Sequence, residues 1–539
     1  MDIDKILVTD ELLFKYKRCH RRGFLNLYGE ENQKLQEKDF IIKLKEERES
    51  HYRKVLENYN LAYQHPKLLV ENSEDNYQVA SATEELMRQG VDCIYQGVII
   101  LNQKIKANPP SSPLIRGERQ ENFSSENQTN IIFQASPTLL IKQNIPSLLG
   151  DWSYIPVNAY LGKNMKPEYK LISAFQTDIL SLFLGINLTQ VQIFLRYYRK
   201  PYYLNLNTWL PHYQEFLREF LSMVMTKNEP EVFISRQRCS LCQWYESCHG
   251  VAKSQQHLSL IPNITPSRYD ALIAEGINDL TSLYHTDLSV LKQLFGAEIA
   301  YNIHGQSKAL FYSTPIIKHP PLKQIPSHNI ELYFDIEAQP DTKIERFDRT
   351  FDYLLGVLLV NYETKEQKYY SFLAENIEEE KEIWLKFLDF VNQYPDAPIF
   401  HYSNYEVETV RRLGYLYKTS SRDLQRLLNR LFDLHKFLIN SLFLPVENYS
   451  LKFVGNWLGF QWRDAQTGKY SSNYHQISGD QCVFWYDQWL KTFDRTWLDY
   501  ILIYNEDDCL GTYQLKKWLT EFTKEIGDKS ELDVKIGDG

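Results

Sequence analysis

The chain of 539 residues is long enough for two to four domains, and its 43% hydrophobic and 24% charged residues are typical of globular proteins. It contains no run of about 18 apolar residues, and its acidic start lacks the basic and apolar regions of a signal peptide, so we expect a cytoplasmic protein with no membrane segment. The net charge of -9 excludes a bulk basic surface, so any contact with nucleic acid must use local patches.

The first half of the chain predicts helices followed by strands. Residues 10–90 are mostly helical in pattern, and the β-branched run at 91–104 predicts a strand. Residues 104–130 are rich in Asn, Ser, Pro and charge, which indicates an exposed, disordered insert at the tip of a hairpin. A strand over 150–162 and a helix over 167–185 follow.

The second half predicts a helical module and then a mixed α/β domain. Short helices broken at Pro, Asn and Gly occupy 256–314, and a proline-rich linker over 315–327 marks a domain boundary. Strands followed by helices are expected over 328–525, and a loose tail over 526–539. The predicted fold class is therefore multidomain α/β.

Three cysteines lie close together in RCSLCQWYESC, at Cys239, Cys242 and Cys248. In a reducing compartment, clustered thiols indicate metal ligands, but three thiolates are one short of the usual set of four. Cys19 is the best fourth ligand, because its basic neighbours favour the thiolate. The other cysteines lie in apolar elements or in the far domain: Cys93, Cys482 and Cys509.

One early cysteine followed by C-x2-C-x5-C resembles the four-cysteine clamp of RecB-family nucleases. The resemblance covers about residues 1–255 and implies a restriction-endonuclease-like domain whose two ends are joined by a [4Fe-4S] cluster. Zinc is the alternative, because four cysteines also suit tetrahedral Zn²⁺ and His20 and His249 are adjacent spare ligands.

The RecB resemblance also implies a nuclease motif, which is altered here. The family places an acidic residue before a strand that carries [DE]-x-K, and the two acids hold Mg²⁺. Asp151 matches the first acid, but Asn158 and Tyr160 stand where the second acid and the lysine belong. We therefore expect this domain to bind nucleic acid without cleaving it.

A substitute set of residues surrounds this altered motif. Glu168 and Lys170 form an E-x-K, although they follow a proline and are predicted to open a helix. His51 matches the helical histidine that many relatives bring to the metal, but an isolated helix-surface histidine is more often without such a role. These residues define a degenerate N-terminal site.

The segment LIPNITPSRYDALIAEGINDLTSLY resembles a helix-hairpin-helix unit, whose tight turn offers backbone amides to a phosphate. Asn263 replaces the turn glycine and can adopt the left-handed conformation. A plain helical module is equally compatible with this pattern.

Two acidic motifs stand out in the C-terminal domain. In IELYFDIEA, strand alternation places Asp335 and Glu337 on one face, opposite an apolar face. A D-x-E on a strand can hold two divalent ions for the attack of water on a phosphodiester. In YNEDDC, Tyr504 and Asp508 lie at i and i+4 on one helix face, with Asp507 one step aside.

In their order, these motifs resemble the DEDD-type exonucleases of the RNase H-like fold, in the YprB-like branch, over residues 328–525. The resemblance implies the catalytic residues Asp335, Glu337, Glu406, Tyr504 and Asp508, with Mg²⁺ or Mn²⁺ at Asp335, Glu337 and Asp508. Glu406, in APIFHYSNYEVETV, replaces the family's second-motif aspartate.

Asp433, in LFDLH, is either an outer acid of this site or a helix cap. A run of cations nearby could follow a phosphate backbone or could be a solvated helix face. It consists of Arg411, Arg412, Lys418, Arg422, Arg426 and Arg430.

The whole chain resembles a family of fusions described as RecB-like putative nucleases. This resemblance implies a metal-dependent 3'-5' exonuclease on single-stranded DNA in repair or defence, with helicase, repair or defence proteins as partners. The alternatives are a non-enzymatic nucleic-acid-binding scaffold of a repair or CRISPR-type assembly, and a zinc-containing RNA exonuclease.

Overall fold

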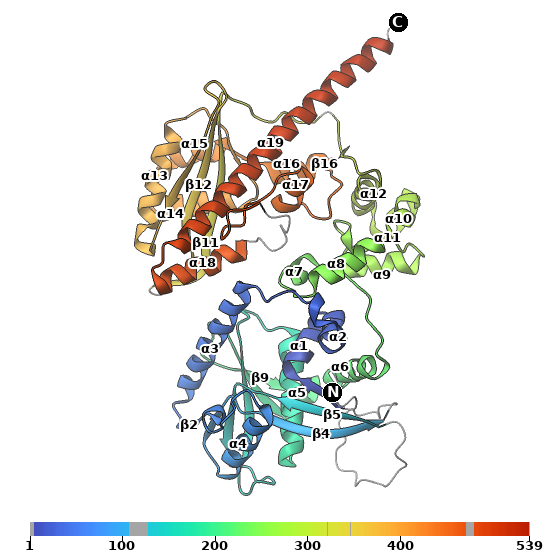
Figure 1. Ribbon diagram of the computed structural model, residues 1–539, viewed down its shortest axis with the longest axis vertical. Coiled ribbons are helices and arrows are strands. Elements are labelled where there is room, and N and C mark those ends of the chain that lie inside the picture. Colours follow the sequence, from blue (N-terminus) through green and yellow to red (C-terminus); the bar gives the residue numbers. More distant parts are fainter. Residues whose placement is uncertain (1–4, 107–127, 321, 345–346, 471–478, 538–539) are drawn as a thin grey trace. The chain divides into compact units, whose positions relative to one another are not determined.

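The computed structural model describes residues 5–106, 128–320, 322–344, 347–470 and 479–537 (Figure 1). The chain forms two compact units. The N-terminal unit comprises 1–232 and 237–248, and the C-terminal unit comprises 233–236 and 249–539. Both units combine helices with β-sheets, which confirms a multidomain α/β architecture.

The N-terminal unit contains two sheets, with strand orders β1-β5-β4 and β2-β3-β6-β7-β8-β9. β4 and β5 pair antiparallel, which confirms the hairpin predicted around the insert, whereas 107–127 lie outside the described residues. The strand predicted at 91–104 is two strands in different sheets, because the chain turns at Gln96, whose φ is 51°. The strands are β1 Lys5–Thr9, β2 Tyr63–Gln64, β3 Cys93–Tyr95, β4 Ile99–Lys106, β5 Gln128–Ala135, β6 Leu139–Gln143, β7 Ser153–Tyr160, β8 Gln190–Leu195 and β9 Tyr202–Asn205.

Helix α5 (Pro167–Leu184) is the central helix of this unit, and most of its residues are buried. It begins at a proline, whose fixed φ suits the first turn, and ends at Gly185 in the left-handed conformation (φ 67°), as its sequence predicts. The remaining helices are α1 Asp10–Arg18, α2 His20–Tyr28, α3 Asp39–Tyr59, α4 Asn76–Arg88, α6 Leu206–Thr226, α7 Arg236–Cys239 and α8 Tyr245–Ser254.

The predicted helical module is present, but it belongs to the same compact unit as the C-terminal sheet. Its helices are α9 Pro266–Ala274, α10 Leu280–His285, α11 Leu288–Phe295 and α12 Ala297–Tyr312. Asn263 adopts the left-handed conformation (φ 71°) expected of it, and its carbonyl accepts a hydrogen bond from Arg268 at 2.6 Å.

The proline-rich linker is anchored along part of its length. β10 (Ile316–Ile317) pairs antiparallel with β16 (Leu442–Phe443), and Leu322 and Ile325 pack against the core of the C-terminal sheet. The apolar residues between the prolines explain this attachment, since their burial stabilises it.

The C-terminal sheet has five strands in the order β13-β12-β11-β14-β15. The three strands expected first in this domain form an antiparallel meander, and β14 and β15 are parallel to β11. The strands are β11 Ile330–Ile344, β12 Phe347–Asn361, β13 Glu366–Leu373, β14 Ile399–His401 and β15 Leu431–Asp433.

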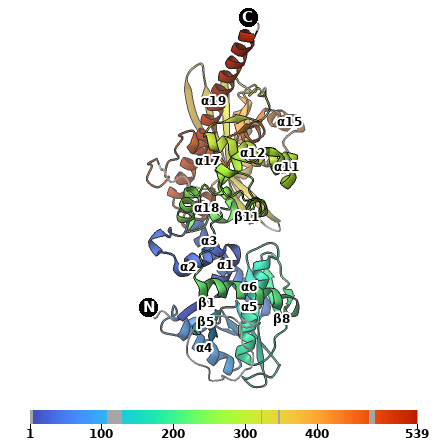
Figure 2. The same ribbon diagram turned by 90° about the vertical axis from the view of Figure 1, so that its right-hand side faces the viewer.

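Helices follow these strands, and the last one is longer than the sequence predicted. They are α13 Glu380–Asn392, α14 Tyr405–Leu416, α15 Ser421–Arg430, α16 Leu434–Ser441, α17 Leu451–Trp457, α18 Gly479–Thr492 and α19 Thr496–Gly537. The loose tail expected over 526–539 is wrong for 526–537, which continue α19 beyond the sheet (Figures 1 and 2). Glu and Lys, which are good helix formers, are frequent in this stretch. None of the described helices has the length and hydropathy that crossing a membrane requires.

Candidate active site

The central strand β11 presents two carboxylates to one side of the C-terminal sheet. Leu332, Phe334 and Ile336 enter the apolar core on the other side, as strand alternation predicts. Helices α18 and α19 pack against β11, and α19 carries Asp508. This arrangement brings a strand motif and a helix motif about 170 residues apart into one site.

Asp335, Glu337 and Asp508 form an acidic triad whose ligand oxygens lie within 4.8 Å of one another. Glu337 is 7% exposed and Asp508 is 9% exposed. Burial raises the pKa of Asp335 well above its usual value, and the charges of Asp508 and Glu337 raise it further. Burial and Asp508 raise the pKa of Glu337 to about 8. Three carboxylates held this close repel one another, so the donor set suits a divalent cation such as Mg²⁺ or Mn²⁺.

Two side chains that sequence analysis missed bind Asp508. Trp462 donates its Nε1 hydrogen to Asp508 Oδ1 at 2.6 Å, and Lys452 Nζ lies 3.5 Å from the same oxygen. Lys452 also donates to the hydroxyl of Tyr504, and its Nζ lies 4.1 Å from that ring's centroid. Burial raises the pKa of Tyr504 well above its usual value, so the phenol stays protonated at neutral pH. Lys452 therefore links the tyrosine to the triad.

Asp335 is fixed by another residue that sequence analysis missed. Asn505 is fully buried and donates its Nδ2 hydrogen to Asp335 Oδ2 at 2.7 Å. Tyr369 donates to Asn505 Oδ1 at 2.7 Å, which orients the amide. Gly356 stands opposite Asp335 in the sheet, and a Cβ there would lie 1.6 Å from Asn505 Oδ1. The glycine therefore makes room for the amide that holds the carboxylate.

Glu406, at the start of α14, lies outside the 4.8 Å group of the triad, although its charge helps to raise the pKa of Asp335. Its Oε2 accepts a hydrogen bond from Ser403 at 2.7 Å and lies 3.5 Å from His401 Nδ1. Both His401 and Glu406 are buried. Glu406 is thus close enough to act on the triad through its charge.

The two neighbouring aspartates have structural contacts. Asp507 accepts hydrogen bonds from the backbone and side chain of Arg463 at 2.6 and 2.8 Å. Asp433 accepts a hydrogen bond from the Lys436 amide at 2.9 Å and caps α16, which favours the helix-cap alternative.

Cys482, on α18, also contacts the triad, although its sequence position gave no sign of this. It is fully buried and hydrogen bonds to Glu337, which helps to lower the pKa of that carboxyl against the effect of burial.

The run of cations after β14 does not form one continuous patch. Arg412 binds the buried carboxylate of Asp352. The guanidinium of Arg430 donates to the carbonyls of three residues, Val391, Tyr394 and Ala397. These two residues hold the fold together, whereas Arg411, Lys418 and Arg422 are exposed. Arg412 and Arg430 therefore fit neither of the two alternatives for this run, a phosphate-binding patch or a solvated helix face.

The four candidate cysteine ligands come from the two ends of the N-terminal unit. Cys19 caps α2, and its sulfur accepts a hydrogen bond from the Arg22 amide at 3.4 Å. Burial raises the pKa of Cys242, and raises that of Cys248 to about 11; Cys19 acts on both thiols through its charge. The Cys239 carbonyl accepts a hydrogen bond from the Cys242 amide. Among the residues that the structure describes, these sulfurs do not form a group of three ligand atoms within 4.8 Å of one another, as the triad does.

The N-terminal nuclease motif is filled by neutral groups. Asn158 is buried and donates to Ser173 Oγ at 3.0 Å, and the hydroxyls of Tyr160 and Ser173 lie 3.3 Å apart. Asp151 is exposed in the bend before β7, whereas Asn158 lies near the far end of that strand. About 3.3 Å of rise per residue separates them by roughly 20 Å, so the structure does not bring these two motif positions together.

The substitute residues lie on the elements that the sequence predicted, but their side chains do not form a site. Glu168 and Lys170 lie in the first turn of α5, and His51 lies on α3. Lys170 Nζ lies over the rings of Trp209 and Tyr202, at 4.6 and 5.9 Å. Across the described ranges, the triad is the one group of three acidic, histidine or cysteine ligand atoms within 4.8 Å.

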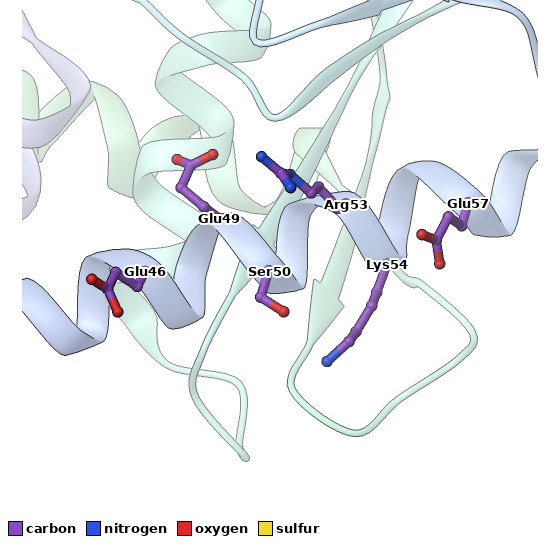
Figure 3. Close-up of a pocket in the computed structure, with 6 residues that line it drawn as sticks. All are labelled: Glu46, Glu49, Ser50, Arg53, Lys54 and Glu57. Atoms are coloured by element: carbon purple, nitrogen blue, oxygen red, sulfur yellow. The ribbon is translucent and has the colours of Figure 1, made fainter. Parts of the chain in front are cut away.

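A surface pocket of about 460 Å³ lies along α3 in the N-terminal unit (Figure 3). The residues that line it come from this one helix: Glu46, Glu49, Ser50, Arg53, Lys54 and Glu57. Acids and bases are mixed here, and Glu49 accepts a hydrogen bond from Gln96 at 2.7 Å. The pocket is therefore a solvated helix face rather than a second acidic site.

Residues 332–520 match the family model described as the RNase H superfamily, so this segment of the C-terminal unit is an RNase H superfamily domain. A search of curated proteins found no significant match to the chain. The RNase H fold implies a nucleic-acid substrate in general terms, and the triad lies within the matched segment. The fold suggests a nuclease-type domain, and the triad is a group of ligands that could hold a divalent metal.

Proposed function

We propose that this protein is a metal-dependent 3'-5' exonuclease whose working site is in the C-terminal unit. The acidic triad is the observation that carries the proposal, because three carboxylates within 4.8 Å in a largely buried site require a cation to stay ionised together. Mg²⁺ or Mn²⁺ bound at Asp335, Glu337 and Asp508 would polarise the scissile phosphate and activate water.

The surrounding residues have distinct roles in this proposal. Tyr504, kept protonated by burial, donates its hydroxyl hydrogen to the attacking water and orients it. Lys452, which binds Tyr504, fixes the phenol and stabilises the negative charge that develops on the phosphate. Glu406 adds a further negative charge beside the triad.

The N-terminal unit binds the nucleic acid and does not cut it. Its motif position holds Asn158, whose amide cannot supply the charge that a metal requires. A [4Fe-4S] cluster held by Cys19, Cys239, Cys242 and Cys248 would join the two ends of this unit. The basic side chains of Arg21 and Arg22 near the sulfurs support it, because their charges partly oppose the rise in the pKa of Cys248 and Cys242 that burial causes. Single-stranded DNA is the proposed substrate, in repair or defence.

The test of the exonuclease uses full-length protein purified without oxygen and end-labelled single-stranded DNA or RNA with Mn²⁺. Wild type should shorten the strand from its 3' end, and Asp335→Ala should lower the rate by about 1000-fold, equivalent to about 4 kcal/mol. Asp494→Asn is the matched control, because Asp494 is an exposed helix cap of the same unit. Equal cleavage by wild type and Asp335→Ala would move the chemistry elsewhere. Binding without cleavage would favour the scaffold.

The test of the cluster measures the metal content of the same protein. The proposal expects a brown protein with four irons per chain, and loss of the iron in Cys242→Ala. Cys93→Ala is the control, because Cys93 is a buried strand residue that pairs with Ile141. Colourless protein with stoichiometric zinc would overturn the iron-sulfur assignment, and a preference for RNA would then favour the zinc-containing RNA exonuclease.

A further inference from the structure

An edge of the six-stranded sheet in the N-terminal unit exposes an unusual number of tyrosines. β9 is the last strand of that sheet, and Tyr202 and Tyr203 on it are 45% and 60% exposed. Tyr197 and Tyr198, in the turn from β8 to β9, are also exposed. Exposed aromatic rings lose the stability of burial, so a group of them on one edge indicates a binding surface.

Cations lie directly over these rings. Lys163 Nζ lies 5.7 Å from the centroid of Tyr197, and Arg196 Cζ lies 5.3 Å from it. Lys170 Nζ lies over both Tyr202 and Trp209. We define the tyrosine surface as the side chains of Lys163, Lys170, Arg196, Tyr197, Tyr202 and Trp209.

The charge around the tyrosine surface is opposite to that of the whole chain. Residues 160–213 contain six Lys and Arg residues and two acids, whereas the net charge of the chain is -9. One of these acids, Asp178, is buried in α5. Arg196 also pairs with Glu47 at 3.0 Å, so part of its charge is balanced within the fold. The surface therefore complements a polyanion.

The parts of the tyrosine surface lie close together in the fold. Tyr202 pairs with Ile193 of β8. Ile193 precedes Arg196 by three residues, which corresponds to about 10 Å along the chain. The Arg196 amide donates to the carbonyl of Tyr160 at the end of β7, three residues before Lys163. Lys170 and Trp209 come from the first turns of α5 and α6, where backbone amides favour anions.

We infer that the tyrosine surface binds single-stranded nucleic acid. Unpaired bases would stack on Tyr197 and Tyr202, and the adjacent lysines would neutralise the phosphates. A duplex is a poor fit, because its bases are stacked on one another and hidden from aromatic side chains. The surface deepens the proposed function by giving the strand a docking place, but binding here does not require cleavage, so the two ideas can fail separately.

The left-handed conformation of Tyr197 fits this role. Its φ is 75°, which is uncommon for an aromatic residue and costs conformational energy. Its ring nonetheless lies near the cations of Lys163 and Arg196. A glycine or asparagine would satisfy this turn without strain, so a strained tyrosine here is consistent with a role for its ring in a contact.

The test measures binding of labelled (dT)20 and of a 20-base-pair duplex to full-length Asp335→Ala protein in EDTA, so that cleavage cannot interfere. The further changes are Tyr202→Ala with Tyr197→Asn, since asparagine tolerates the left-handed conformation. We expect these changes to weaken (dT)20 binding about 10- to 100-fold, because stacking contributes roughly 1–3 kcal/mol per base. Lys170→Gln should weaken it less and lower the salt dependence by roughly 0.7 in log–log slope.

Two controls separate stacking from general damage. Tyr77→Ala removes an exposed tyrosine on α4, and Lys142→Gln removes a cation 5.0 Å over Trp152, both elsewhere in this unit. Both should leave binding unchanged, and Tyr202→Phe should retain it, because the ring and not the hydroxyl makes the contact. Undiminished (dT)20 binding by the folded Tyr202→Ala, Tyr197→Asn protein would overturn the inference. The inference would also be overturned if the protein bound the duplex more tightly than (dT)20. A change of oligomeric state in the variant would overturn it as well.

The same oligonucleotide in RNA form distinguishes the source of the strand. Weaker binding of (dT)20 than of its RNA counterpart would keep the surface and change the substrate from DNA to RNA. Loss of binding in the variant together with unchanged cleavage by Asp335→Ala alone would support the tyrosine surface and refute the proposed active site.

Discussion

Carboxylates that are shielded from water occur in both units, but they are stabilised in different ways, and this difference distinguishes a candidate metal site from a structural contact. Asp10 in the N-terminal unit accepts hydrogen bonds from Gln176 at 2.5 Å and from the amides of Ser136 and Glu11 at 2.9 Å. These donors satisfy it within the fold. Asp335, Glu337 and Asp508 instead lie close to one another, and their mutual repulsion adds to burial in raising the pKa of Asp335 and Glu337.

The nuclease-motif position of the N-terminal unit shows the same contrast with the triad. Asn158 and Tyr160 share hydrogen bonds with Ser173, so this position is neutral and internally satisfied. A neutral network of this kind stabilises the fold and leaves no unpaired charge for a metal. A group of like charges without neutral partners is therefore a better indication of a candidate active site than a match to a motif position.

The largest expected effect concerns which unit cleaves. Asp508→Ala removes a triad ligand and should lower metal-dependent cleavage by at least about 1000-fold, or about 4 kcal/mol, leaving no residual activity from the N-terminal unit. Cleavage rates of end-labelled DNA at saturating Mn²⁺ measure this. Residual metal-dependent cleavage that is lost on adding Glu168→Gln would break the comparison, because it would place a second active site in the N-terminal unit.

A second prediction attempts to restore the lost motif. Asn158→Asp with Tyr160→Lys recreates the D-x-K pattern, but it places two charges in a buried neutral network and should destabilise the N-terminal unit by about 3 kcal/mol. Urea unfolding of the full chain measures the loss. No cleavage should appear in an Asp508→Ala background, since Asp151 lies at the other end of β7. Recovered cleavage would show that the site needs only these two groups.

The sequence predicted the parts of the site that follow from local periodicity. Alternation along β11 correctly placed Asp335 and Glu337 on one face, and helical spacing correctly placed Tyr504 beside Asp508. Lys452, Trp462 and Asn505 have no such local pattern, because their positions depend on how α17 and the segment after it pack against α19, and on how α19 packs against the sheet.

The same limit explains the errors elsewhere. Arg412 and Arg430 carry charge at helical spacing, but their partners, Asp352 and three backbone carbonyls, are distant in sequence. Asp151 follows the expected order of motifs, yet the β6–β7 hairpin puts it at the wrong end. Order along a chain does not fix which end of a strand faces a site.

A third prediction concerns the support of Asp335. Asn505→Ala removes the hydrogen bond to Asp335 Oδ2 and should weaken Mn²⁺ binding about 10- to 100-fold, as loss of an outer contact to a metal ligand usually does. Isothermal titration with Mn²⁺ measures this without a nuclease assay. Tyr369→Phe removes only the bond to the amide oxygen and should have a smaller effect. Equal Mn²⁺ affinity in wild type and Asn505→Ala would show that Asp335 needs no positioning.

The smallest expected effect is a pH dependence in the N-terminal unit. Burial raises the pKa of Asp10 from 3.8 to about 6, despite the hydrogen bonds that it accepts. The folded unit therefore binds more protons than the unfolded chain between about pH 4 and 6, so its stability is greatest below this window and falls as the pH rises through it. The loss should be about 1–2 kcal/mol, less than the full shift would give, because Asp10 keeps some contact with water.

Urea unfolding at several pH values, followed by hydrogen exchange in α5, measures this loss. Asp10→Asn should remove most of the slope between pH 4 and 6, whereas Asp151→Asn, an exposed acid of the same unit, should leave it unchanged. An unaltered slope in Asp10→Asn would assign the pH dependence to another group. Asp10 would then be as fully satisfied as its hydrogen bonds indicate, and the contrast with the acidic triad would be sharper.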